Sequence, residues 1–271
     1  MRLGTCTWAG HGLVSMRLGS LQRYATYFLT ARHCVRRANE SGDKPVVRVN
    51  SAETGVSVID ISTLTWNYPD NDASDMAVSE LIPDGLYSGT TLKAFDISLI
   101  LTKDEAKRVQ LGIGDELICT GLFQMRTGDR RNIPIARFGN LAAMPEEPLL
   151  DEDSGLEFDA FLAEIRSIGG LSGSPVFTRL PPGRKDPDGE TAISQQWFWL
   201  GTIRGHWRQD QFSAADATSG EASMLNTGIA MVTPAWEALE VLNDDDYVRD
   251  RRESERELRK KDAPGEAPTS S

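Results

Sequence analysis

The sequence has few of the residues that build metal sites and disulfide frameworks. Its 271 residues include only three cysteines and three histidines. Cys6, Cys34 and Cys119 are too scattered for a disulfide framework, so we expect three free thiols and a reducing, cytoplasmic compartment. Zinc ligands would have to cluster at short spacings, and the adjacent pair His33 and Cys34 has the wrong geometry for a two-ligand clamp. We therefore expect no metal and no cofactor.

Long apolar runs and an excess of positive charge are also missing. No segment approaches the roughly 18 apolar residues of a membrane span, and residues 1–8 lack the apolar core of a secretory signal. Lys and Arg number 29 against 40 Asp and Glu, which gives a net charge of −11. Without a basic surplus the chain is poorly suited to neutralise a phosphate backbone. These absences argue against membrane and nucleic-acid partners.

Two glycine-containing motifs of other enzyme classes are incomplete. Gly112-Ile113-Gly114 lacks the third glycine and the following helix of a dinucleotide-binding site. Residues 170–174 read Gly-Leu-Ser-Gly-Ser, so they lack the final glycine of an α/β-hydrolase nucleophile elbow. The sequence therefore disfavours both of these enzyme classes.

Short apolar or alternating segments, separated by turn residues, are abundant and are typical of β-strands. Before Asn243, helical patterns are limited to residues 102–109 and to a segment that starts at Thr233-Pro234, an N-cap residue followed by proline, and runs through Leu242. Many short strands and a C-terminal helix favour an all-β barrel protein over a βαβ sheet. The predicted strands are residues 27–30, 45–49, 56–61, 76–78, 116–119, 174–177, 197–200 and 228–232.

The composition changes at Asn243. Residues 244–262 are nearly all charged, and the spacing of Glu255 to Arg259 and of Glu257 to Lys261 supports a solvated helix. Residues 263–271 are rich in Ala, Pro and Ser, and we expect them to be disordered.

Three segments carry residues suited to nucleophilic catalysis. His33 ends an apolar strand in Thr30-Ala31-Arg32-His33-Cys34, and Asp75 precedes another in Asp75-Met76-Ala77-Val78. Ser172 lies in Gly170-Leu171-Ser172-Gly173-Ser174-Pro175, where the glycines allow a turn that aims two backbone N–H groups at one point. Taken alone, the histidine fits a core position and the glycine-serine segment fits an ordinary turn.

Together, the three segments resemble the trypsin-like (chymotrypsin-fold) serine peptidases of the bacterial type. That family has Thr-Ala-x-His-Cys, Asp-[Ile/Leu]-Ala-[Leu/Val] and Gly-x-Ser-Gly-[Gly/Ser]-Pro in the same order along the chain. The resemblance covers about residues 4–242. It implies an all-β fold of two six-stranded antiparallel barrels with a C-terminal helix. The expected units are residues 1–98, a barrel carrying His33 and Asp75; residues 99–242, a barrel carrying Ser172 and the helix; and residues 243–271, the charged helix and tail.

The resemblance also implies a role for each site residue. Ser172 would attack the scissile carbonyl, His33 would accept its proton, and Asp75 would orient the imidazole. The backbone N–H groups of Gly170 and Ser172 would bind the oxyanion, and the substrate would be a peptide or protein. Ser174 precedes a proline at the start of the next strand, so we favour Ser172 as the nucleophile.

Two departures from the family pattern bear on function. Leu171 replaces the aspartate that pairs with a new N-terminus in zymogen-activated members, so we expect activity without cleavage. Arg204 stands where the family has a small hydroxyl residue near the triad aspartate; it could pair with Asp75, or the register could differ by one residue. Two alternatives therefore stay open: a non-catalytic peptide-binding module on the same fold, and a regulatory protease of a bacterial stress or defence system that a protein partner activates.

The expected pocket for the side chain before the cut contains three hydrogen-bond donors. In the family, the residue six positions before the serine lies on the pocket floor, which here is Arg166. Arg204 and His206 fall on the expected wall. Three donors would favour an acidic or polar side chain in the substrate. Alternatively, Arg166 pairs with Glu164 or Asp159 and points to solvent.

Overall fold

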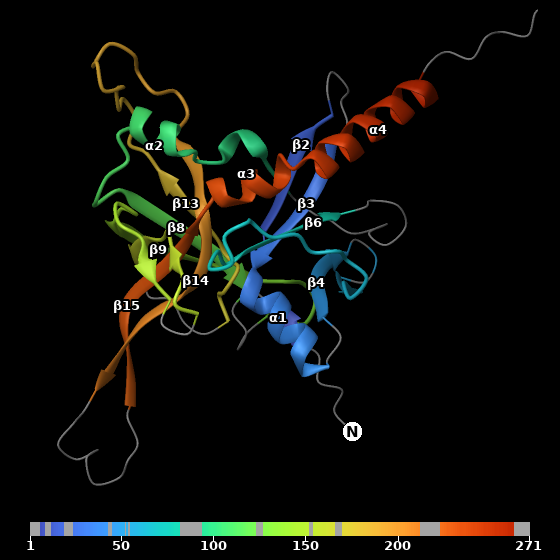
Figure 1. The fold of residues 1–271 in the computed structure, drawn as a ribbon, viewed down its shortest axis with the longest axis horizontal. Helices are drawn as coiled ribbons and strands as arrows, with labels where there is room; N and C mark the ends of the chain where they lie inside the picture. The colour runs from blue at the N-terminus through green and yellow to red at the C-terminus, as the bar shows by residue number, and fades with distance from the viewer. Residues whose placement is uncertain are drawn as a thin grey trace, which may run out of the picture.

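The computed structural model describes most of the chain and is mainly β-structure. The described residues are 6–8, 12–18, 24–42, 45–51, 53, 55–81, 94–122, 127–151, 154–165, 170–211 and 223–262. The N-terminal sheets lie beside a barrel built from later strands, and the C-terminal helices reach from the barrel onto the N-terminal sheets (Figure 1). No described helix is long and apolar enough to cross a membrane.

Two sheets form the N-terminal part. In the four-stranded sheet, the order of strands is β6-β3-β2-β7. In the three-stranded sheet, the order is β1-β4-β5. The bounds are β1 (Cys6–Trp8), β2 (Gly12–Arg17), β3 (Tyr24–Ala31), β4 (Pro45–Ser51), β5 (Gly55–Asp60), β6 (Met76–Leu81) and β7 (Phe95–Asp96).

The four-stranded sheet buries both of its faces, as the alternation of side chains along β3 dictates. Phe28 faces the three-stranded sheet and helix α1 (Arg32–Ser41), and it packs with Val47 and Ile59. Tyr27 and Leu29 face the other way and pack against the C-terminal helices. Because β3 is covered on both sides, its sequence is a nearly continuous apolar run.

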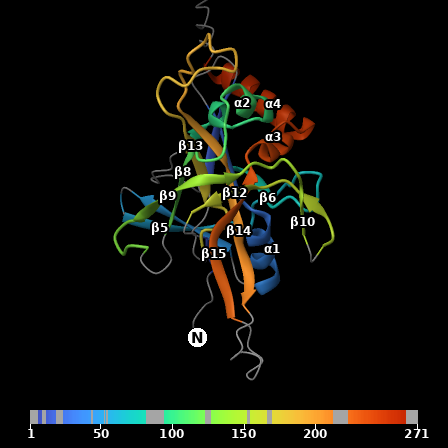
Figure 2. The same ribbon diagram turned by 90° about the vertical axis from the view of Figure 1, so that its left-hand side faces the viewer.

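Six later strands close into an antiparallel barrel in the order β12-β15-β14-β13-β8-β9. Its core contains the fully buried Leu117, Phe161 and Phe198. Beyond the barrel, β14 and β15 continue as a long two-stranded ribbon (Figure 2). The bounds are β8 (Glu116–Leu122), β9 (Pro134–Ala143), β12 (Phe161–Glu164), β13 (Pro175–Arg179), β14 (Trp197–Gln211) and β15 (Ser223–Pro234).

Shorter elements connect and cover the sheets. The helix α2 (Lys103–Arg108) begins after Thr102, whose side chain accepts a hydrogen bond from the N–H of Glu105 at 3.0 Å. A small hairpin pairs β10 (Leu149–Leu150) with β11 (Glu157–Phe158). The remaining helices are η1 (Ile97–Leu99), α3 (Trp236–Leu242) and α4 (Asp245–Asp262).

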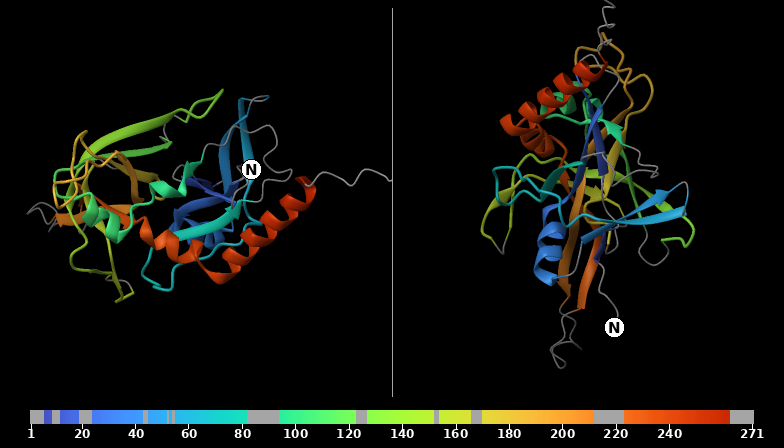
Figure 3. Two further views of the ribbon diagram at one scale, coloured as in Figure 1. Left: turned by 90° about the horizontal axis from the view of Figure 1, so that it is seen from above. Right: turned by 90° about the vertical axis from the view of Figure 1, so that its right-hand side faces the viewer.

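The C-terminal helices tie the two parts together. From above, α4 runs along the N-terminal sheets and away from the barrel (Figure 3). Ala238 and Leu242 of α3 and Tyr247 of α4 pack in one cluster with Tyr27 of β3. Tyr27 and Tyr247 meet edge to face, with ring centroids 5.5 Å apart. The second half of the chain therefore contributes directly to the core of the first.

The sequence prediction of an all-β class is confirmed, and so is one closed six-stranded antiparallel barrel followed by a C-terminal helix. The described N-terminal strands form two separate sheets, and their closure into a first barrel stays a prediction. The predicted start of the terminal helix is wrong. Thr233 and Pro234 pair with Thr202 and Gly201 as the end of β15, and α3 begins at Trp236.

Candidate active site

His33 lies at the start of a helix rather than at the end of a strand. Strand β3 ends at Ala31, and His33 is the second residue of α1. The first N–H groups of a helix have no partner within it, and Ala31 at the N-cap offers no side-chain acceptor. The carboxylate of Asp75 fills this role, since its Oδ1 accepts a hydrogen bond from the main-chain N–H of His33 at 2.8 Å.

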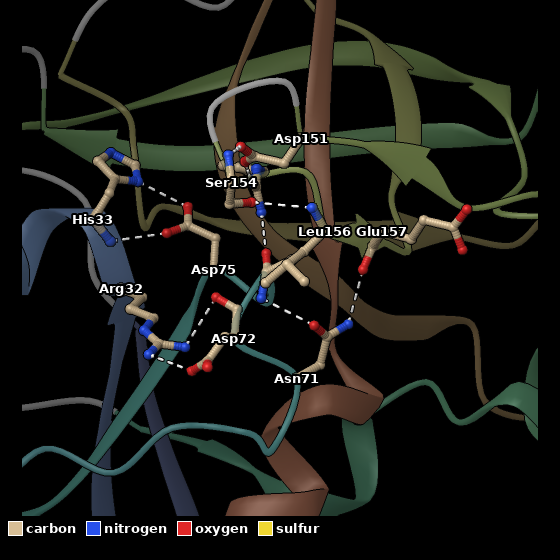
Figure 4. A network of polar contacts seen from close by, with 11 residues as sticks. Arg32, His33, Asn71, Asp72, Asp75, Asp151, Ser154, Leu156 and Glu157 are labelled. Atoms are coloured by element: carbon tan, nitrogen blue, oxygen red, sulfur yellow. Dashed lines mark hydrogen bonds and ion pairs between the residues drawn. The ribbon is translucent and has the colours of Figure 1, made fainter.

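The same carboxylate also holds the imidazole. Oδ2 of Asp75 lies 2.8 Å from Nδ1 of His33, so one carboxylate fixes both the backbone and the ring of the histidine (Figure 4). Asp75 directly precedes β6, and the antiparallel register of Ala31 with Met76 brings it alongside the start of α1. Its 6% exposure keeps water from competing for these bonds. The second position of α1 and the residue before β6 therefore form a preassembled pair.

The pKa of His33 is raised to about 9 by this environment. Burial alone would lower it, but the hydrogen bond with Asp75 and a weaker one with Cys34 outweigh that effect. Sγ of Cys34 lies 3.6 Å from Nε2, on the opposite side of the ring from Asp75. The imidazolium is thus the favoured form of His33 at neutral pH.

Ser172 lies on a tight turn at the edge of the barrel. The N–H of Ser174 donates to the carbonyl of Leu171 at 2.9 Å, and Gly170 and Gly173 have φ of +93° and +79°. These left-handed conformations favour glycine, which explains the glycines on each side of the serine. The N–H of Gly173 donates to the carbonyl of Ile203 at 2.8 Å and anchors the turn to β14.

The two serines of this turn differ in accessibility. Ser172 is half-buried, whereas Ser174 is fully buried and its Oγ has no hydrogen-bond partner within the described part of the chain. Leu171 is 2% exposed and anchors the turn in the protein interior. Of the two hydroxyls, that of Ser172 is therefore the one that a substrate can approach.

Cys34 links the serine turn to His33. Its Sγ lies 4.0 Å from the main-chain oxygen of Ser172 and 3.6 Å from Nε2 of His33. Among the described residues, no hydrogen bond joins Ser172 to the imidazole. The structure thus brings His33, Asp75 and Ser172 to one place, with the base held by Asp75 and the serine next to Cys34.

The residues expected to line the substrate pocket are not gathered in this way. Arg166 lies outside the described residues. Arg204 donates to the carbonyl of Ala73 at 2.6 Å and pairs with Asp151 at 2.5 Å, and not with Asp75. His206 lies on β14 opposite Ala230. A role of Arg166, Arg204 and His206 in substrate recognition stays a prediction.

Contacts that the sequence did not indicate surround the segment before Asp75. Arg32 donates to the carbonyl of Asp72 at 3.1 Å and pairs with its carboxylate at 3.0 Å. The side-chain amide of Asn71 donates to the carbonyl of Glu157 at 3.0 Å (Figure 4). Each partner comes from a distant part of the chain, so no local pattern could have predicted these pairs.

The described residues contain no group of three or more His, Cys, Asp or Glu side chains that could hold a metal ion. The arrangement of Asp75, His33 and Ser172 fits acid–base and nucleophilic chemistry, since an imidazole held by a carboxylate lies near an accessible serine.

No protein-family model and no curated protein matches the chain. In solved structures, it is similar to the MamO protease domain from Magnetospirillum magneticum, with 13% identity and a TM-score of 0.47 over 88% of this chain and 97% of that one. It is also similar to the active form of the Rv3671c protease from M. tuberculosis, with 14% identity and a TM-score of 0.39 over 87% and 79%. A third similarity is to Cellulomonas bogoriensis chymotrypsin, with 13% identity and a TM-score of 0.37 over 87% and 95%. All three are weak likenesses.

Proposed function

We propose that the chain is a serine endopeptidase that hydrolyses peptide bonds through Ser172, His33 and Asp75. The observation that carries this proposal is the pair of 2.8 Å hydrogen bonds that one buried carboxylate accepts from the backbone and the ring of His33. A carboxylate on Nδ1 selects the tautomer whose Nε2 can accept a proton. That arrangement supports the role of general base for His33.

In the proposed reaction, Oγ of Ser172 attacks the carbonyl carbon of the substrate while Nε2 of His33 takes the hydroxyl proton. The N–H groups of Gly170 and Ser172 bind the resulting oxyanion. Collapse of the tetrahedral intermediate breaks the C–N bond, and the imidazolium gives its proton to the leaving amine. Water then repeats the sequence on the acyl-enzyme and releases Ser172. Asp75 stabilises the imidazolium at each stage.

The resting contact between Nε2 and Cys34 has to be exchanged for one with Ser172 before this reaction starts. Catalytic hydrogen bonds are often long or absent in ligand-free enzymes and tighten on substrate binding. A short movement of the Ser172 turn, which already touches Cys34 through its carbonyl oxygen, would make that exchange.

Two alternatives remain as proposals. The contact of Nε2 with a thiol instead of the serine favours a non-catalytic peptide-binding module. The same contact suits a regulatory protease in which a protein partner aligns Ser172, as in a bacterial stress or defence system. A cytoplasmic location, which the sequence suggested, stays a prediction.

A fluorophosphonate probe separates these readings, because only an activated serine reacts with it. We expect labelling of the intact chain at Ser172, with no loss of mass from the N-terminus, since Leu171 offers no partner for a new terminal ammonium. Labelling that appears only after cleavage within residues 1–10 would contradict this expectation. Complete absence of labelling at any pH would favour the binding module, and labelling only with added cell extract would favour the partner-activated protease.

A further inference from the structure

The residues just before Asp75 are held from the other half of the chain. The hydroxyl of Ser74, a buried side chain, donates to Oε2 of Glu237 in the first turn of α3. The carbonyl of Ala73 accepts a hydrogen bond from Arg204 of β14 at 2.6 Å. Two successive residues next to Asp75 are thus fixed by two charged side chains that follow Ser172 in the sequence.

Arg204 is itself rigidly placed. Its guanidinium lies 3.8 Å from the ring centroid of Phe158 and pairs with Asp151 at 2.5 Å. Ala73 packs in one cluster with Phe158 and Ala160, so the loop rests on the same surface that carries the arginine. A planar guanidinium that stacks, pairs and donates at once loses little freedom by doing so.

Glu237 is embedded among charged groups. Asp159, Arg204 and Glu240 act on it electrostatically, and Lys103 pairs with Asp159 at 3.1 Å. Burial, as the largest effect, raises the pKa of Glu237 to about 7. Burying a carboxyl is unfavourable unless its hydrogen bonds are satisfied, and the bond from Ser74 supplies one. Glu240 supports the same loop further away, where it accepts from the N–H of Asp70 at 2.9 Å.

We propose that Glu237 and Arg204 are positioning residues for the His33–Asp75 pair. They hold Ser74 and Ala73 from the second half of the chain and so aim the carboxylate of Asp75 at His33. In the family that the sequence resembles, a small hydroxyl residue stands at the position of Arg204. Here the arginine does not pair with Asp75 and instead donates a hydrogen bond to the carbonyl of Ala73, two residues before it. The catalytic meaning of this assignment rests on the proposed function.

The geometry at His33 explains why the positions of Ser74 and Ala73 matter for Asp75. Asp75 accepts two hydrogen bonds of 2.8 Å from one residue, and both weaken if its backbone shifts. A misplacement of about 1 Å in a catalytic group can cost roughly 100-fold in rate. Loss of the hydrogen bond from Asp75 also removes the main cause that raises the pKa of His33.

The pKa of His33 is therefore the direct readout, and NMR titration of a chain with three histidines can measure it. We expect a pKa near 9 in the unaltered protein and a fall toward 6.5 in Glu237→Ala and in Arg204→Ala. Glu237→Gln keeps the size and one acceptor oxygen for Ser74, so it should restore most of the raised pKa. The matched control is Glu257→Gln, on the exposed face of α4, which should leave the pKa unchanged.

Labelling by the fluorophosphonate probe at pH 9 gives the second readout, and it should slow by roughly 100-fold in Glu237→Ala. A pKa of His33 that stays near 9 in folded Glu237→Ala and Arg204→Ala would overturn the assignment. If Glu237→Ala does not fold, an unchanged pKa in folded Arg204→Ala would overturn it as well, and so would a fall of the His33 pKa in the control Glu257→Gln as large as that in Arg204→Ala. Failure of the unaltered protein to react at all would refute the proposed function, while the titration would still test the positioning.

Discussion

The His33–Asp75 pair and the turn that carries Ser172 differ in how firmly they are assembled. His33 is held through both its backbone and its ring by one carboxylate, that of the buried Asp75. Ser172 lies on a glycine turn whose hydrogen bonds fix its neighbours and whose contact with the base passes through Cys34. The imidazole of His33 is thus held in place by Asp75, whereas no hydrogen bond among the described residues joins Ser172 to it.

This difference indicates where control of the reaction would act. A preassembled Asp75–His33 pair costs nothing to form when substrate arrives. The step that remains is the exchange of Cys34 for Ser172 at Nε2, which a substrate or a partner could drive by binding to the turn. Each prediction below tests one side of this contrast.

The largest effect should come from removing the nucleophile. Ser172→Ala is expected to abolish probe labelling and to reduce peptide hydrolysis by roughly 10⁴-fold or more, leaving only the contribution of the oxyanion site and binding. Ser174→Ala is the matched control, and it should retain most of the activity because that hydroxyl is buried and unpartnered among the described residues. The reverse pattern in labelling rates would show that the motif is misassigned.

The second effect concerns pH. A base must be neutral to accept a proton, so a His33 pKa of about 9 places the rising limb of activity near pH 9, with roughly 1% of the limiting rate at pH 7. An unperturbed histidine, as the sequence alone suggests, would give this limb near pH 6.5. The rate of probe labelling measured from pH 5 to 10 decides between them, and a midpoint near 6.5 would mean that the Asp75 contact is weak in solution.

The same pKa predicts how stability depends on pH. The folded state holds the proton on His33 more tightly than the unfolded chain does, so the stabilisation is complete below about pH 6.5 and is lost as pH rises through 9. Denaturant unfolding of the protein and of His33→Gln should therefore diverge at low pH and converge above pH 9. Parallel curves across this range would contradict the raised pKa.

The sequence predicted the strands well because their signal is local. Each of the eight predicted segments overlaps a strand, and only the end residues Ile61 and Ser174 fall outside it, since short apolar runs between turn residues have few other solutions. The charged segment after Asn243 forms α4, and Glu255 pairs with Arg259 at 2.7 Å. In the predicted strand at residues 197–200, Phe198 and Trp199 are buried and Trp197 is exposed.

The errors come from features that depend on distant partners. Helix α1 is short and polar, with Val35 and Ala38 as its buried residues. Its first turn is capped by the carboxylate of Asp75, which directly precedes β6. The sequence Thr233-Pro234 is typical of a helix start, but both residues belong to β15, because they pair with β14 in the barrel. The motifs named His33 and Asp75, which the structure places in contact, whereas the partners of Arg204 and Ser74 come from distant parts of the chain and had no local signal.

A moderate effect should come from crowding the serine turn. A Cβ added at Gly121 of β8 would clash with Oγ of Ser174 and would lie 2.9 Å from Cδ2 of Leu171. Gly121→Ala is therefore expected to destabilise the protein by about 1–3 kcal/mol and to disturb Ser172 more than His33. Thermal unfolding and probe labelling measure these effects.

The crowding has an internal control. Adding Ser174→Ala removes the nearest clashing atom and should restore much of the stability that Gly121→Ala loses. Gly112→Ala, where the nearest atom is 3.9 Å away, should cost little. Equal losses in the single and double variants would show that the turn is not packed against β8 as described.

The smallest effect should come from Cys34, the residue between the two sides. Its hydrogen bond to Nε2 is a secondary cause of the raised pKa of His33, after that of Asp75. Cys34→Ala should therefore shift the alkaline limb of probe labelling to somewhat lower pH, with a midpoint between 6.5 and 9. It should also raise the labelling rate near pH 7, because Nε2 is then both less protonated and free to meet Ser172.

Cys119→Ala is the control for this variant. It removes the buried thiol of β8 and should leave the midpoint in place, since Cys119 has no contact with His33 among the described residues. A midpoint that does not move in Cys34→Ala would mean that the thiol does not occupy Nε2 in solution, and the serine would then be as well prepared for reaction as the histidine.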